Sequence, residues 1–178
     1  MSEESKRFDI GYLLEHTELL KENEYIEAKA ALGGLPESIW ETYSAFANTY
    51  GGYILLGVAE REDKSLYTVN LPYPEVLADR FIRDLGDRRI VSADVLRSGD
   101  VRIMTAGGNK IVVIHVPRAR PCHRPVYKGR SAYSGSYRRV GESDIQMGRA
   151  EVNWELAKQR FASSVCRIRG RDPEKAKM

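Results

Sequence analysis

One continuous apolar segment constrains the fold of this chain more than any other feature. The run GYILLGV, residues 52–58, contains no charged side chain. A strand that is apolar on both faces has to be covered on both faces, so we expect it to lie centrally in a sheet. The run IVVIHV, residues 111–116, has the same character and predicts a second buried strand. Other elements must therefore pack against the sheet that contains these two segments.

A helix is predicted directly before the first apolar run. It should begin at Pro36, because proline is favoured at the first helical position. Apolar side chains then recur at spacings of three and four, at Ile39, Tyr43, Phe46 and Tyr50. Gly51 is a natural end for this helix, since glycine readily takes the backbone conformation that closes one.

The remaining segments complete an α+β pattern. Residues 25–30 alternate between polar and apolar side chains, as in a half-buried strand, and a late strand should end at Gly141. Helical spacing marks residues 9–21, 74–85 and 151–166, the second with Val76, Leu77, Phe81 and Leu85 on its core side. Turns at residues 98–100 and 107–109 separate further strands. A chain of 178 residues supports one sizeable core, so we expect a mixed sheet with helices packed against it.

The adjacent glycines Gly51 and Gly52 do not fit a phosphate-binding loop. Such a loop follows a strand, precedes a helix and ends in Gly-Lys-Ser or Gly-Lys-Thr. Here a helix comes first, a strand follows, and no such lysine is present. We interpret the pair as a helix end followed by close backbone packing.

Positive charge is concentrated in one part of the chain. The net charge is only +3, but residues 101–141 contain no Asp or Glu and nine Lys or Arg. A segregated basic block indicates an anionic partner, with nucleic acid first. The alternative is a solvated basic face without a partner.

Tyrosines alternate with the basic residues of this block, and prolines keep part of it extended. Guanidinium groups bind phosphates, and tyrosine rings stack on unpaired bases. An edge strand whose tyrosines pack on the core is the alternative. The predicted nucleic-acid contacts are Arg118, Arg120, Arg124, Tyr127, Lys128, Arg130, Tyr137, Arg138 and Arg139.

A second candidate site lies near the N-terminus. Glu27 and Lys29 share one face of the predicted strand, and Glu22 precedes them by five residues. Metal-dependent nucleases often pair a carboxylate that holds the metal with a lysine that positions the phosphate or the attacking water. Exposed strands also commonly carry alternating charges of no catalytic role, so both interpretations remain open.

No feature indicates a membrane or a secreted protein. No apolar run approaches the roughly 20 residues that span a bilayer, and the first residues lack a signal-peptide pattern. Two cysteines, Cys122 and Cys166, form no disulfide framework and no zinc-ligand spacing. We expect a cytoplasmic protein.

Four blocks of the sequence resemble, in order, those of the Schlafen AlbA-2 family. They are ENEYIEAKAAL, LPESIWETYSAFANTYGGYILLGV, IVVIHVPRARPCHRPVY and GSYRRVGES, and the resemblance covers residues 22–144. It implies an AlbA-like, Schlafen-type α+β domain over residues 22–150. A helical extension, residues 1–21, would precede it, and a C-terminal helix with a charged tail, residues 151–178, would follow.

The resemblance also implies two functions. Prokaryotic members are described as DNA-binding domains, here of a transcriptional regulator, whereas Schlafen relatives include RNases that cut structured RNA such as tRNA. In an RNase, Glu22 and Glu27 would hold Mg²⁺ or Mn²⁺, with Lys29 beside them. The family's third acid follows a Gly-Val pair, and here Ala59 and then Glu60 occupy that place. Vertebrate Schlafens pair two lobes, so a similar clamp would need a homodimer.

The sequence is therefore compatible with three functions. The leading prediction is a DNA- or RNA-binding domain that contacts mainly the phosphate backbone. The first alternative is a metal-dependent endoribonuclease that uses Glu22, Glu27, Lys29 and Glu60. The second is a regulatory module that binds a nucleotide or a protein.

Overall fold

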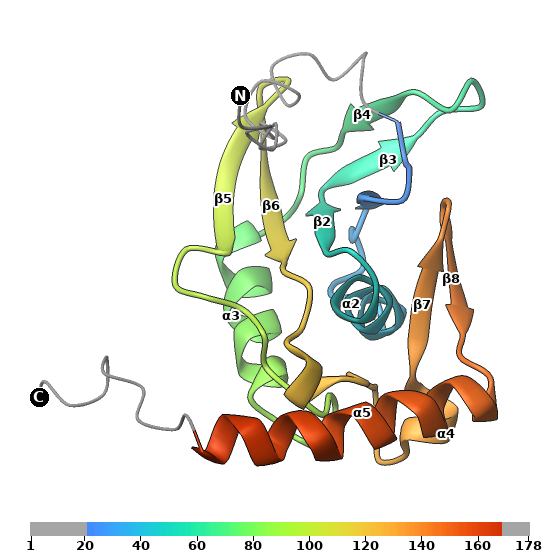
Figure 1. The fold of residues 1–178 in the computed structure, drawn as a ribbon. Helices are drawn as coiled ribbons and strands as arrows, with labels where there is room; N and C mark the ends of the chain where they lie inside the picture. The colour runs from blue at the N-terminus through green and yellow to red at the C-terminus, as the bar shows by residue number, and fades with distance from the viewer. Residues whose placement is uncertain (1–20, 169–178) are drawn as a thin grey trace, which may run out of the picture.

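A four-stranded mixed sheet forms the centre of the molecule (Figure 1). The computed structural model describes residues 21–168, with side chains through residue 163, so the helix predicted over residues 9–21 lies almost wholly outside the described residues. The strand order is β1 (Ile26–Lys29), β2 (Gly52–Leu56), β6 (Asn109–Val116) and β5 (Val101–Ala106). β1 runs parallel to β2, and the other neighbours are antiparallel. The two apolar runs are the central strands, as predicted.

Two helices cover one face of this sheet. α2 (Ile39–Asn48) and α3 (Pro74–Leu85) pack their apolar sides on Ile54 and Leu56 of β2 and on the matching residues of β6. Leu55 points to the opposite face, where a smaller cluster includes residues of the hairpin β3 (Val58–Glu60) and β4 (Leu66–Thr68). The predicted α+β class, a mixed sheet with helices packed against it, is confirmed.

Several predicted boundaries are wrong. α2 begins at Ile39 rather than Pro36, because the preceding residues form a tighter turn in which the amide of Ile39 donates to the carbonyl of Pro36. It ends before Tyr50, whose side chain is 62% exposed. Val76 is 64% exposed rather than in the core. The strand predicted over residues 52–58 stops at Leu56, because Gly57 has a φ of +90° and the chain leaves the sheet there.

The C-terminal part adds a second small layer. The short helices η2 (Pro121–His123) and α4 (Ala132–Gly135) precede a hairpin of β7 (Tyr137–Val140) and β8 (Ser143–Gln146). The sequence predicted only one late strand in this region. α5 (Arg149–Ile168) then crosses one end of the molecule, below α2 and the hairpin in the view of Figure 1. Within residues 21–168, none of the helices has the length and apolar character to cross a membrane.

The two adjacent glycines act as packing residues. The amide of Gly51 donates to the carbonyl of Phe46 at 2.8 Å and closes α2, with a φ of +80°. A Cβ at Gly51 would lie 2.7 Å from the carbonyl oxygen of Val116, and one at Gly52 would lie 2.7 Å from the Phe46 ring. These contacts confirm the interpretation as a tight turn from a helix into a buried strand.

Candidate functional site

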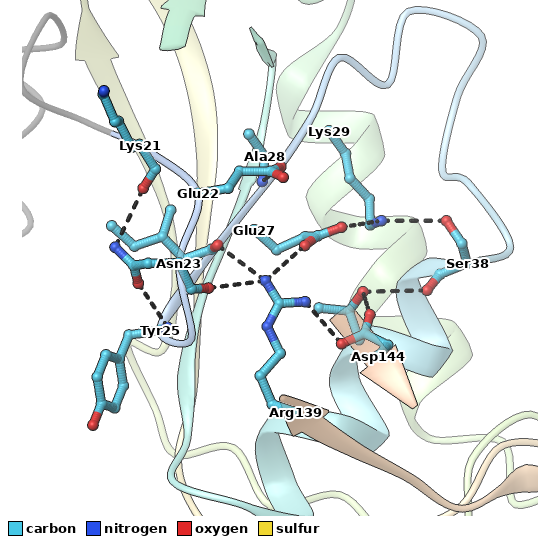
Figure 2. Close-up of polar contacts among 12 residues, drawn as sticks. Lys21, Glu22, Asn23, Tyr25, Glu27, Ala28, Lys29, Ser38, Arg139 and Asp144 are labelled. Atoms are coloured by element: carbon cyan, nitrogen blue, oxygen red, sulfur yellow. Dashed lines mark hydrogen bonds and ion pairs between the residues drawn. The ribbon is translucent and has the colours of Figure 1, made fainter. Parts of the chain in front are cut away.

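A buried arginine on β7 lies at the centre of the predicted acidic site. Figure 2 shows the Arg139 guanidinium between β1 and β8, with only 1% of the side chain exposed. Its Nη1 lies 2.8 Å from Asp144 Oδ1, and its Nη2 lies 3.0 Å from Glu27 Oε2. Nη2 also donates to the carbonyls of Asn23 at 2.9 Å and Ile26 at 3.3 Å. Arg139 therefore fastens the β7–β8 hairpin to the start of β1.

Both carboxylates beside Arg139 have further partners. Glu27 Oε1 accepts from Lys29 Nζ at 2.9 Å, and Lys29 also donates to Ser38 Oγ at 3.3 Å. Asp144 Oδ2 accepts from the Thr42 hydroxyl at 2.6 Å. Two cations thus face two carboxylates, and every carboxylate oxygen has a donor. The cluster is balanced in charge.

Glu22 lies next to this cluster. Its Oε1 accepts from the amide of Ala28 at 2.9 Å. Burial raises the pKa of Glu22, and the negative charges of Glu27 and Glu60 raise it further, against the effect of the amide. Glu60, on β3, is held by an ion pair with Lys64 at 2.7 Å. Glu22 is thus close enough to the other two acids of the predicted set to be repelled by both.

These acids do not form a metal site as they are arranged. Across residues 21–168, no group of three or more His, Cys, Asp or Glu side chains is placed to hold a metal ion. Each oxygen of Glu27 already pairs with a cation, and Lys29 and Arg139 would compete with a metal ion for this carboxylate. Ligation by Glu22 and Glu27, with Lys29 and Glu60 beside them, stays a prediction.

Some of the residues predicted to contact nucleic acid are exposed in the structure, and others are buried. Arg118, Arg120 and Arg130 are exposed. Arg124 and Arg139 are buried, which removes them from a phosphate-binding surface. Arg139 can be buried because Glu27, more than 100 positions away in the chain, and the nearby Asp144 neutralise its charge.

The other residues predicted to contact nucleic acid are partly exposed, and several of them contact other side chains of this chain. Lys128 forms an ion pair with Glu41 and lies 5.6 Å from the centre of the Tyr137 ring. Partial burial lowers the pKa of Lys128, but the hydrogen bond to Glu41, the charge of Glu41 and the contact with Tyr137 together outweigh burial, so the pKa is raised. Arg138 Nε lies 3.0 Å from Glu151 Oε1. Tyr127 is half-buried, and its amide donates to the Ser92 hydroxyl at 2.9 Å.

Two polar residues of α2 hold in place the basic segment, which is the part of the basic block that follows β6, residues 117–141. The Ser44 hydroxyl donates to the Val126 carbonyl at 2.7 Å and accepts from the Tyr137 amide at 2.9 Å. The Asn48 side chain donates to the carbonyls of Val126 at 2.8 Å and Tyr137 at 3.0 Å, and accepts from the Val126 amide at 2.8 Å. Neither residue was predicted from the sequence to have a role. The available signal was a pair of polar side chains four residues apart within the mainly apolar stretch 43–48.

A small hollow lies beside the exposed arginines at the end of β6. It has a volume of about 200 Å³ between residues 94–97 and 117–123. Arg97, Arg118, Arg120 and His123 line it, with Asp94 as the acidic residue. The exposed arginines 118 and 120 thus lie beside further basic side chains.

Comparison with known proteins identifies the family. The model of the family described as "Schlafen, AlbA_2" matches residues 22–148. The chain belongs to the Schlafen AlbA_2 family. Among curated proteins, no sequence matches it.

Two solved structures are similar to this member of the family. One is the N-terminal domain of an ATP-dependent DNA helicase RecG-related protein from Nitrosomonas europaea, with 31% identity and a TM-score of 0.54. The alignment covers 76% of this chain and 91% of that one. The other is the DIP2311 protein from Corynebacterium diphtheriae, with 16% identity and a TM-score of 0.53, covering 85% of this chain and 27% of that one. The second likeness concerns the fold alone.

Proposed function

We propose that this chain is a nucleic-acid-binding domain that holds its partner mainly through phosphate groups. The observation that carries the proposal is the absence of Asp and Glu from residues 101–141, together with the exposure of Arg118, Arg120 and Arg130 in that stretch. Guanidinium groups match phosphate oxygens in geometry and stay charged at every physiological pH. Contacts of this kind position a nucleic acid without reading its sequence.

The arrangement of the segment supports the proposal. Ser44 and Asn48 fix its backbone at Val126 and Tyr137, so little conformational freedom is lost when it binds. Figure 1 shows the segment after β6 running beside α5 at one end of the molecule. The RecG-related neighbour is named as DNA-helicase-related, which agrees with a role on nucleic acid. A transcriptional regulator, a cytoplasmic location and a homodimer stay predictions.

Fluorescence anisotropy with labelled duplex DNA, single-stranded DNA and RNA at low salt tests the proposal. We expect binding by the wild type and weaker binding by the double variant Arg118→Ala, Arg120→Ala. The double variant Arg61→Ala, Arg83→Ala removes the same charge from exposed positions outside the basic segment and should bind nearly as the wild type does. Absence of binding to all three probes, or equal losses in both variants, would reject the proposal.

One observation favours the endoribonuclease as a second candidate. Burial raises the pKa of Glu22, the charges of Glu27 and Glu60 raise it further, and a bound cation would relieve the repulsion among them. Incubation of tRNA with Mn²⁺ and either wild type or Glu27→Gln tests this candidate. Absence of Mn²⁺-dependent cleavage by the wild type, or equal cleavage by Glu27→Gln, would reject this candidate. Cleavage by the wild type that Glu27→Gln abolishes would establish the nuclease.

A further inference from the structure

A ligand-sized cavity lies between the two helices that cover the sheet and the basic segment. Its volume is about 550 Å³, within the usual range of small-molecule sites. The start of α2, the end of α3 and residues 128–134 surround it. Its apolar lining consists of Leu35, Pro36, Trp40 and Ile90.

The polar lining of this cavity is mainly basic. Arg80, Arg89, Lys128 and Arg130 line it, against the carboxylates of Glu37 and Asp84. Arg80 Nε lies 3.6 Å from Asp84 Oδ2, so that pair is loose. Arg89 pairs with Asp87, outside the lining, at 2.7 Å, and Lys128 pairs with Glu41.

Arg130 differs from the other three basic residues. It is exposed, and within residues 21–163 no hydrogen bond or ion pair engages its guanidinium, which contributes only a long-range attraction to Asp87. Its fork of donors is therefore available to an anion at the edge of the cavity. The cavity offers an apolar wall and an uncommitted cation side by side.

The aromatic part of the wall is held rigidly. Trp40 is 8% exposed, and its ring stacks on Phe81 with centroids 5.1 Å apart and an interplanar angle of 5°. Tyr43 contacts the same indole edge-on at 5.9 Å. Only the small exposed part of the indole therefore meets the cavity, and it is held in a fixed position, so little ordering is needed on binding.

We propose that this cavity receives one unpaired nucleotide, with its base against Leu35, Trp40 and Ile90 and its phosphate at Arg130. A base has flat faces that pack on apolar side chains, and it is linked to an anionic phosphate, so a nucleotide matches an apolar wall that lies beside Arg130. The inference rests on the proposed function, because Lys128 and Arg130 belong to both surfaces. A free nucleoside monophosphate carries the same groups and is the other source of this ligand.

Tryptophan fluorescence tests the inference directly. The chain has two tryptophans, and Trp154 is 66% exposed on α5. In the variant Trp154→Phe, the remaining tryptophan signal reports on the cavity alone. We expect adenosine monophosphate or a single-stranded oligonucleotide to quench it, and the oligonucleotide to do so less when its bases are replaced by abasic sites. Quenching by the monophosphate alone would assign the cavity to free nucleotides, and quenching by the oligonucleotide would assign it to the bound strand.

Two further variants separate the cavity from general charge effects. Arg130→Ala should raise the ligand concentration needed for half-maximal quenching about tenfold, the usual effect of a lost charged hydrogen bond. Ser134→Tyr should block quenching by filling the cavity. Arg61→Ala, at an exposed arginine outside both the cavity and the basic block, should leave the titration unchanged.

Three results would overturn the inference. Anisotropy that shows strand binding without any change in Trp40 emission would reject the cavity while leaving the proposed function intact. If the strand changes neither the anisotropy nor the Trp40 emission, and the monophosphate has no effect, the cavity and the proposed function are rejected together. Equal quenching by a hexaglutamate peptide, unaffected by abasic sites, would assign the cavity to acidic peptides.

Discussion

The Arg139 guanidinium ties β7 to β1 and β8 through two carboxylates and two backbone carbonyls. Its attraction to Glu27 and Asp144 acts where little water is present, so loss of the guanidinium would leave the buried Asp144 carboxylate without an ionic partner and Glu27 with Lys29 alone. We predict that Arg139→Ala lowers the free energy of unfolding by about 3–5 kcal/mol, as measured by urea denaturation.

The neighbouring residue provides the control for this prediction. Arg138 is 43% exposed and pairs with Glu151 at the surface. Arg138→Ala should therefore cost less than about 1 kcal/mol. Equal losses in the two variants would mean that the Arg139 pairs contribute no more than surface pairs do.

Glu22 gives a prediction about pH. Burial, with repulsion from Glu27 and Glu60, holds its pKa above the ordinary 4.5, so the folded chain binds this proton more tightly than the unfolded chain. Ionisation at neutral pH therefore works against folding. Glu22→Gln should raise the free energy of unfolding at pH 7, and the gain should disappear as the pH falls below 4.5.

Thermal unfolding at pH 7 and at pH 4 measures this effect. Glu62→Gln, at an exposed loop position, should change neither value. A Glu22→Gln variant that is less stable than the wild type at pH 7 would show that the carboxylate charge stabilises the fold.

At the scale of elements, α2 links the core to the candidate nucleic-acid surface. One side of the helix packs on the sheet, while Ser44 and Asn48 bind the backbone at Val126 and Tyr137. Two hydrogen-bonding side chains one turn apart thus determine where a long irregular segment lies. The sheet, through this helix, sets the position of the basic side chains.

Removal of the Asn48 side chain should loosen that segment. Asn48→Ala leaves the amide and carbonyl of Val126 with fewer partners, which should cost about 1–3 kcal/mol and weaken nucleic-acid binding. Hydrogen exchange at the Val126 amide should accelerate. Asn70→Ala, at an exposed position, is the control, and unchanged exchange at Val126 would contradict the role given to Asn48.

The central elements could be predicted from the sequence, whereas the small ones could not. β2 and β6 are long apolar runs, and α3 carries strong helical spacing, so local pattern alone identifies them. The β3–β4 hairpin and β8 are short and partly exposed, and their residues show no such pattern. The burial of Arg139 could not be predicted either. Its partner Glu27 is distant in the sequence, and nothing near Arg139 in the sequence distinguishes it from Arg138.

At the scale of the whole molecule, charge is separated along the chain. Acids contribute to the cluster around Arg139, while the stretch 101–141 lacks them and exposes arginines at one end of the β-sheet. A nucleic acid that binds there displaces counterions from its phosphates, so its affinity must fall as salt is added. The cavity near Trp40 would add a contact that depends on the base rather than on salt.

A salt titration of nucleic-acid binding tests the central claim most directly. For the wild type we predict that the logarithm of the association constant falls linearly with the logarithm of salt concentration. The Arg118→Ala, Arg120→Ala variant should reduce the slope by about one for each phosphate contact that is lost. Binding that is absent at low salt, or that does not change with salt, would contradict the account.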